Sequence, residues 1–334
     1  MRFGLALPHY DFSVPAERRP VTFAAAAAAA TDAERLGFDS VWVSDHFFYH
    51  FGRYGEPEPP FGSLEPLTTI AGIAALTERV RVGTLVLGAP FRHPSLLAKA
   101  VSTLDALSGG RIDVGVGAGW LEDEFSAFGY RYGTVGERFA RLEETLQVLE
   151  ALLGGGEASG TFGDVTLRSA RLRPPPVQRP RPPVWVGGKG GPRLLRLAAR
   201  HADGWNLVWR VTPEDYARKV HDVGAACEAQ GRDPGTFRRT VGLYALIAED
   251  ARSVAARWER ARASMPGRAL DGESWEDWQA DTLSGTPEQV LERVAAFEAL
   301  GVEELIISPW TLPFAVPEPD MLDVVAASVI APLR

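Results

Sequence analysis

An aspartate and a histidine stand side by side directly after a short apolar run near the N-terminus. Asp45 and His46 follow the run 40–43, and aromatic residues come next at 47–49. A histidine can shuttle a proton at neutral pH or hydrogen-bond a cofactor ring, and a neighbouring aspartate can fix its position. We therefore predict that Asp45 and His46 are catalytic and also contact a cofactor. The residues by themselves leave open a loop-capping aspartate beside a packed histidine.

A glycine-rich segment follows another apolar run, at 115–119. Acidic residues come after it at 122–124 and would repel a phosphate, so the segment does not suit a dinucleotide-binding turn. Small residues at the end of a strand instead let a flat ring approach the backbone. We predict that Gly117, Ala118 and Gly119 contact a cofactor ring.

A second glycine-rich segment has different neighbours. Gly187, Gly188 and Lys189 follow an apolar run and precede a predicted helix. Free backbone amides and the positive end of a helix favour an anion at such a position. We predict that these three residues bind a cofactor phosphate; the alternative is a flexible turn.

Histidines and tryptophans near other predicted strand ends are candidates for a substrate pocket. They are His9, His50, Trp120, Trp205 and Trp310. A tryptophan there can line an apolar pocket, and packing at the rim is an equal alternative. The sequence has no HExxH helix, no GxSxG elbow and no Walker loop, and we predict no metal site.

A repeating order of strand, loop and helix positions these residues. We expect strands at 3–7, 40–43, 81–87, 111–116, 184–186, 204–208, 239–248 and 304–308. Eight such units predict an α/β fold, a (β/α)8 TIM barrel whose active face lies at the carboxyl ends of the strands. An open doubly wound sheet would usually have fewer strands and a glycine-rich turn after the first strand, which this sequence lacks.

The expected barrel spans residues 1–334 as a single domain with two insertions. One lies near 154–183 and contains a predicted hairpin at 160–172. The other lies near 251–283, where a polar segment rich in tryptophan indicates an inserted helical excursion.

Composition narrows the class of protein. The chain has 334 residues, 46% of them hydrophobic, so it can bury a large core. A net charge of -8 argues against nucleic acid or an anionic membrane as the main partner. The single cysteine excludes an internal disulfide framework. With no signal peptide or membrane span in the sequence, we expect a cytoplasmic enzyme acting on a small molecule.

Seven segments together resemble the bacterial-luciferase-like superfamily of flavin and deazaflavin oxidoreductases, most closely its coenzyme F420-dependent branch. The segments are 37–46, 83–87, 108–112, 115–121, 186–188, 202–206 and 285–290. The resemblance implies a TIM barrel with Asp45 and His46 at the deazaflavin ring. It also implies a bulge at Leu85 and Val86, often with a non-prolyl cis peptide, that supports the ring from behind.

The same resemblance leaves the substrate open. Sugar-phosphate dehydrogenases of this branch carry a glutamate where this chain has Trp120 and a tryptophan where it has His50. These departures disfavour oxidation of a sugar 6-phosphate. The leading hypothesis is hydride transfer between coenzyme F420 and a small organic substrate.

Two other functions remain open at this point. One is an FMNH2-dependent two-component monooxygenase, fed by a separate reductase. The other is a non-catalytic cofactor-binding barrel. A homodimer is expected from the family resemblance alone.

Overall fold

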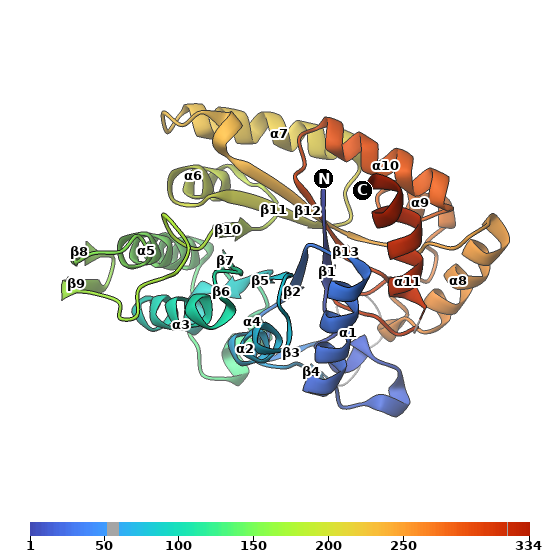
Figure 1. Cartoon of the computed structure of the whole chain (residues 1–334), viewed down its shortest axis with the longest axis horizontal. Coiled ribbons are helices and arrows are strands. Elements are labelled where there is room, and N and C mark those ends of the chain that lie inside the picture. Colours follow the sequence, from blue (N-terminus) through green and yellow to red (C-terminus); the bar gives the residue numbers. More distant parts are fainter. Residues whose placement is uncertain (52–59, 319) are drawn as a thin grey trace.

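Eight parallel strands close into a barrel in the computed structural model, which describes residues 1–51, 60–318 and 320–334 (Figure 1). The barrel strands are β1 (Arg2–Ala6), β2 (Ser40–Val43), β5 (Arg81–Thr84), β7 (Ile112–Gly117), β10 (Val184–Gly187), β11 (Gly204–Trp209), β12 (Arg238–Tyr244) and β13 (Glu304–Ser308). Each pairs in parallel with its neighbours, and the pairing of β10 with β7 closes the ring. The predicted (β/α)8 barrel is therefore confirmed.

Helices cover the outside of this barrel. They are α1 (Phe23–Leu36), α2 (Pro66–Leu76), α3 (Pro94–Ser108), α5 (Val135–Leu153), α6 (Pro192–His201), α7 (Pro213–Glu228), α10 (Pro287–Ala299) and α11 (Met321–Val325). Local sequence sets their ends. Gly37 ends α1 with a φ of +89°, which glycine adopts without steric cost. Thr134 and Glu137 form a capping box at the start of α5.

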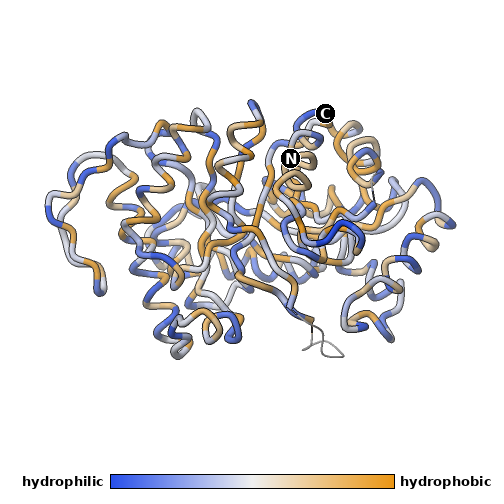
Figure 2. Tube along the Cα trace, turned by 90° about the horizontal axis from the view of Figure 1, so that it is seen from below, coloured by the Kyte–Doolittle hydropathy of each residue, from blue (hydrophilic) through white to orange (hydrophobic). Residues whose placement is uncertain are grey.

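The buried side chains form two clusters. The larger one fills the space between the strands and the helices. The second cluster is rich in aromatic residues and includes Trp42, Leu85, Trp185 and Trp310. Hydrophobic residues accordingly concentrate along the central strands in Figure 2, with hydrophilic residues on the outer turns. None of the described helices is long and apolar enough to cross a membrane.

Two predicted strands are wrong in their extent. The strand expected at 81–87 is divided into β5 and β6 (Leu87–Gly88), because Leu85 and Val86 interrupt it with a non-prolyl cis peptide between them. The strand expected at 239–248 ends at Tyr244, where β12 loses its pairing with β13.

Several short elements extend the barrel. The predicted hairpin is present as β8 (Ala158–Phe162) and β9 (Val165–Ala170), which extends away from the barrel at the left of Figure 1. The segment near 251–283 contains α8 (Ala251–Ala263) and α9 (Trp275–Ala280). Helix α4 (Glu122–Ala127) and the small pair β3 (Phe48–Tyr49) and β4 (Phe61–Gly62) were not predicted. The sequence also predicts a long loop at 50–63, and residues 52–59 of it lie outside the described part of the chain.

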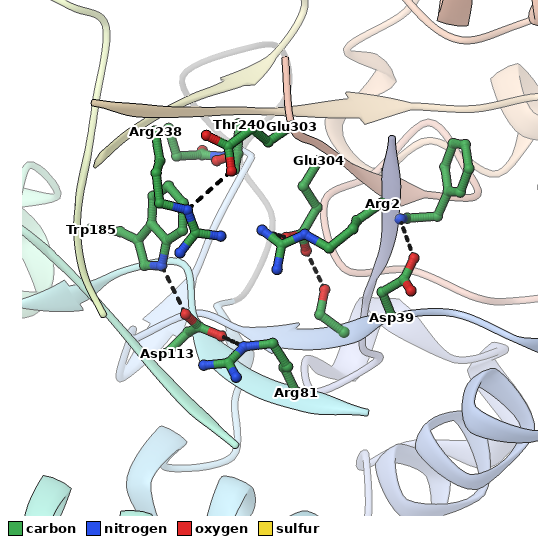
Figure 3. Close-up of polar contacts among 12 residues, drawn as sticks. Arg2, Asp39, Arg81, Asp113, Trp185, Arg238, Thr240, Glu303 and Glu304 are labelled. Carbon is green, nitrogen blue, oxygen red and sulfur yellow. Dashed lines mark hydrogen bonds and ion pairs between the residues drawn. The ribbon is translucent and has the colours of Figure 1, made fainter. Parts of the chain in front are cut away.

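Paired charges close the amino end of the barrel (Figure 3). Arg81 contacts Asp113 at 2.5 Å, and the indole of Trp185 donates to the same carboxylate at 3.1 Å. Arg2 pairs with Glu304 at 3.1 Å, and burial raises the pKa of Glu304. Because these residues stand at the starts of their strands, they fill the amino end of the barrel, and the active face expected for this fold is the opposite end.

Candidate functional site

His46 is held by a buried glutamate from α4. Nδ1 of His46 lies 2.9 Å from Oε1 of Glu124, and the amide of Phe47 donates to Oε2 at 3.0 Å. An ionised carboxylate only accepts, so Nδ1 carries the proton in this pair. Among the described residues, Nε2 of His46 has no hydrogen-bond partner. The imidazole therefore has one nitrogen fixed by Glu124 and one nitrogen that no described residue engages through a hydrogen bond.

Asp45 has a different environment from His46. Its Oδ2 accepts the amide of Gly88 at 2.9 Å, and Arg92 binds both carboxylate oxygens, with Nη2 3.1 Å from Oδ1. Arg92 also reaches Glu65 at 2.6 Å. Both oxygens of Asp45 are thus engaged in tying the end of β2 to β6. This arrangement matches the structural alternative for Asp45, and its predicted catalytic role stays a prediction.

The bulge at Leu85 and Val86 needs glycines on the facing strands. A Cβ placed on Gly117 would lie 2.8 Å from Cγ2 of Val86, and one on Gly187 would lie 2.6 Å from Cγ1. Both distances are too short for carbon atoms, so a larger residue at either position would displace Val86. The structure therefore brings Leu85, Val86, Gly117 and Gly187 together from three separate segments.

The other predicted ring-contact residues have local roles in the structure. Gly119 has a φ of +75°, and a Cβ there would lie 2.7 Å from the ring of Phe125. Ala118 is partly buried against the main apolar cluster. Contact of either residue with a cofactor remains a prediction.

The loop before α6 differs from the predicted anion site in one respect. The amide of Gly188 donates to the carbonyl of Asn206 at 3.2 Å, so this amide is not free for a phosphate. No hydrogen bond occupies the amides of Lys189, Gly190 and Gly191 among the described residues, and no side chain caps α6.

Three cations surround this loop. Lys189 Nζ lies 3.5 Å from the carbonyl of Val208, and Lys219 Nζ lies 3.3 Å from the carbonyl of Gly190. Arg193 stands in the first turn of α6 and donates to the carbonyl of Gly136 at 3.2 Å. The loop can therefore meet an anion with backbone amides and with positive side chains.

His9 is buried and neutral. Its Nδ1 donates to the carbonyl of Leu7 at 2.9 Å, and its Nε2 accepts the amide of Ser44 at 3.1 Å. Burial lowers the pKa of His9 to about 3. Because it is enclosed and both nitrogens are bonded, we do not retain His9 as a substrate-pocket residue.

The predicted pocket tryptophans fall in different places. Trp205 is fully buried, stacks on Tyr216 of α7 with centroids 5.9 Å apart, and donates to the carbonyl of Gly188 at 2.9 Å. It therefore supports the loop before α6 from behind, and we do not retain it as a pocket residue. Trp310 is buried in the aromatic cluster.

Trp120 and His50 lie near His46. The indole of Trp120 is edge-on to His46 with centroids 5.5 Å apart, and Tyr49 lies 5.8 Å from the same imidazole. His50 Nε2 lies 2.7 Å from Oδ2 of Asp123, the residue before Glu124. Helix α4 therefore places its acidic residues beside both histidines.

Sequence reasoning missed Glu124 and Lys219. The acidic run at 122–124 was interpreted only as unsuited to phosphate, although its position after a strand end was a signal for a partner to His46. Lys219 lies on α7, and only the packing of α7 against α6 brings it to the loop. Among the described residues, no group of three or more histidines, cysteines, aspartates or glutamates could hold a metal ion.

Known proteins share this fold and parts of this sequence. The phthiodiolone/phenolphthiodiolone dimycocerosates ketoreductase of Mycobacterium tuberculosis is 30% identical over 291 residues, which cover 82% of this chain and 73% of that protein. A monooxygenase from Streptomyces bottropensis has a TM-score of 0.77 and 24% identity, with 100% of both chains covered. An F420-dependent secondary alcohol dehydrogenase, solved in complex with an F420-acetone adduct, has a TM-score of 0.78 and 19% identity, covering 99% of this chain and 98% of that one.

The two structural likenesses establish the fold. A sequence model of the luciferase-like monooxygenase family matches residues 1–304, which is most of the chain. With the barrel, this match decides the family. The chain belongs to the luciferase-like monooxygenase family, whose members are oxidoreductases and monooxygenases.

Proposed function

We propose that this protein is a coenzyme F420-dependent oxidoreductase that transfers hydride between the cofactor and a small organic carbonyl compound or its alcohol. The observation that carries the proposal is the imidazole of His46, which buried Glu124 fixes through Nδ1 and whose Nε2 has no hydrogen-bond partner among the described residues. A carbonyl group that gains a hydride must also gain a proton to become an alcohol. An alcohol that loses a hydride must likewise lose its hydroxyl proton. An imidazole held in one orientation suits both directions.

The residues around the site fit a phosphorylated flat cofactor. The bulge at Val86 packs into space left by Gly117 and Gly187, which gives a firm surface beneath a ring. The loop before α6 offers the amides of residues 189–191 and the helix end for a phosphate. When bound, the deazaflavin supplies or accepts the hydride, as cofactors of this kind do.

His46 and Glu124 together handle the proton that accompanies hydride transfer. Glu124 keeps the proton on Nδ1 and orients the ring, while Nε2 takes the proton of an alcohol. In the reverse direction the imidazole, then protonated on both nitrogens, returns that proton to the carbonyl oxygen. Asp45 holds the scaffold by binding Arg92 and the amide of Gly88. Its effect on the reaction is therefore to keep the end of β2 in place.

Charge at the loop favours coenzyme F420 over FMN. FMN carries one phosphate, whereas coenzyme F420 carries carboxylates beyond its phosphate. Lys189, Lys219 and Arg193 surround the loop, so additional anionic groups find cations near the phosphate position. The sequence relative from Mycobacterium tuberculosis is named a ketoreductase, which supports chemistry at a carbonyl.

The test is a titration of the purified protein with coenzyme F420 and, separately, with FMN, each in oxidised and reduced form, followed by quenching of tryptophan fluorescence. We expect tighter binding of coenzyme F420, by roughly 10-fold or more, since two or three additional screened charge contacts each contribute up to about 1 kcal/mol. Equal or tighter binding of FMN would overturn the proposal in favour of an FMNH2-dependent monooxygenase with a separate reductase. Binding of neither would favour a barrel that does not use these cofactors.

A further inference from the structure

The exposed face of α6 carries a row of arginines. Arg193, Arg196 and Arg200 are exposed, whereas the leucines and alanines of the helix are buried. Residues three and four positions apart share one face of a helix, so the three arginines form a single row. Helix α6 packs between α5 and α7 on the outside of the barrel (Figure 1). We call Arg193, Arg196 and Arg200 the cationic row.

No carboxylate among the described residues forms an ion pair with the cationic row. Helix α6 contains no acidic residue. The neighbouring helices use their carboxylates elsewhere, since Glu150 of α5 lies 3.0 Å from His201 and Asp222 of α7 lies 3.1 Å from Lys219. The chain has 43 acidic and 35 basic residues, so its overall composition does not explain a face that is only positive. A positive face without internal partners can attract an anionic ligand.

The helix dipole accounts for only one member of the row. A cation in the last turn is favourable, which explains Arg200. A cation in the first turn is unfavourable, yet Arg193 stands there and no acidic residue accompanies it. Its guanidinium donates to the carbonyl of Gly136 at 3.2 Å and lies 5.1 Å from the ring centroid of Phe139. Arg193 is therefore held beside the start of α6 at a position that suits an anion.

The row continues directly from the loop proposed to hold the cofactor phosphate. The amides of residues 189–191 precede the first turn of α6, and Arg193 lies in that turn. From residue 191 to residue 200 the helix rises about 14 Å, at roughly 1.5 Å a residue. An extended residue spans about 3.5 Å, so a chain of four or five residues that starts at the loop can reach Arg200.

We propose that the cationic row binds the glutamate tail of coenzyme F420, which carries its carboxylates beyond the phosphate. This inference rests on the proposed function, because the phosphate must be anchored at the loop before α6. Arg193 meets the carboxylates nearest the phosphate, Arg196 the next ones, and Arg200 those of a longer tail. Guanidinium groups suit this task, because each can donate two parallel hydrogen bonds to one carboxylate.

The length of the tail provides the test. The full chain is titrated at low salt with coenzyme F420 that carries no, two or five glutamates, and quenching of tryptophan fluorescence reports binding. We expect the affinity to rise by about 2- to 5-fold for each arginine that the tail reaches, and the rise to shrink in high salt. Equal affinity of the three forms would overturn this inference and leave the proposed function intact. Binding of none of them would overturn the proposed function, and this inference with it.

A double variant locates the tail on the row. Arg196→Gln with Arg200→Gln leaves the loop and Arg193 unchanged. It should weaken the form with five glutamates by about 4- to 25-fold and the form without glutamates by less than about 2-fold. An unchanged affinity for the form with five glutamates would overturn the inference. Circular dichroism checks that the variant is folded.

The control removes the same amount of charge from other helices. Arg218→Gln with Arg252→Gln takes one exposed arginine from α7 and one from α8. It should change the affinity for every form by less than about 2-fold, because exposed charges far from the tail are screened. If this control weakened the form with five glutamates as much as the α6 variant does, net charge would explain the effect and the inference would be wrong.

Discussion

Replacing Glu124 with glutamine should change the chemistry of His46 more than the stability of the fold. The carboxylate accepts Nδ1–H of His46 and the amide of Phe47, and its side chain is almost fully buried. In Glu124→Gln, the amide oxygen can still accept from Phe47, while the amide NH2 must face Nδ1. We therefore expect the imidazole to switch tautomer, with its proton moved to Nε2.

The loss of the carboxylate charge sets the expected changes in stability and turnover. Two charge-assisted hydrogen bonds become neutral ones, and each loses about 1 kcal/mol, so the variant should unfold on the order of 3 °C lower. Glu124→Ala would leave both donors without an acceptor and should cost about 2–6 kcal/mol. Turnover of Glu124→Gln should fall by about 100- to 10,000-fold, the range seen when an acid–base group or its orienting carboxylate is removed.

Three measurements on one preparation of Glu124→Gln test the role given to Glu124. Nitrogen NMR of the imidazole reports the tautomer, and thermal unfolding reports stability. Reduction of oxidised coenzyme F420 by an alcohol reports turnover in the direction in which Nε2 must accept a proton. Asp123→Asn is the matched control, because Asp123 is the adjacent carboxylate, pairs with His50 and is 64% exposed; it should change neither the His46 tautomer nor the melting temperature. Glu124→Gln with wild-type turnover and an unchanged tautomer would refute the role given to Glu124.

Three further perturbations probe the bulge, the anion loop and His9. Gly187→Val should cost about 1–3 kcal/mol and weaken cofactor binding, because a Cβ there meets Val86 at 2.6 Å; denaturant unfolding and fluorescence titration measure both effects. Lys189→Ala combined with Lys219→Ala should weaken coenzyme F420 by about 2- to 30-fold, more than FMN, and the effect should shrink as salt is raised. His9 binds a proton in the unfolded chain below pH 6.5 but in the folded chain only near pH 3. Acidification from pH 6.5 to 5 should therefore remove about 2 kcal/mol of stability through His9, and His9→Phe should lose this dependence in urea unfolding at several pH values.

Each of these perturbations has a control and an outcome that contradicts it. Gly191→Ala should be tolerated, since nothing lies within 4 Å of a Cβ there; equal damage by both glycine variants would mean that Val86 is not the cause. Arg218→Ala removes a cation from the same helix as Lys219, paired with Asp215, and should leave cofactor affinity unchanged. A salt-independent loss in the lysine variants would mean that their contribution is not electrostatic. An identical pH slope in His9→Phe would mean that other groups govern acid unfolding.

The sequence determined the barrel because the fold depends on signals that are local and repeated. Apolar runs of strand length alternate with helices whose ends are marked by residues such as Gly37 and Thr134. Eight such units have few ways to bury their apolar faces other than a closed parallel sheet surrounded by helices. The same order places strand ends on one face, so the neighbourhood of Asp45 and His46 could be predicted before any contact was known.

Only the tertiary structure decided which side chains meet there. His46 and Glu124 are 78 residues apart, and nothing in the intervening sequence specifies that a six-residue helix brings them to 2.9 Å. Trp205 was expected in a pocket, yet it faces the helices and stacks on Tyr216. Successive side chains of a strand point to opposite faces, so a difference of one residue in the barrel's register decides between pocket and helix layer. That register is set by packing around the whole ring of strands, and no local sequence pattern specifies it.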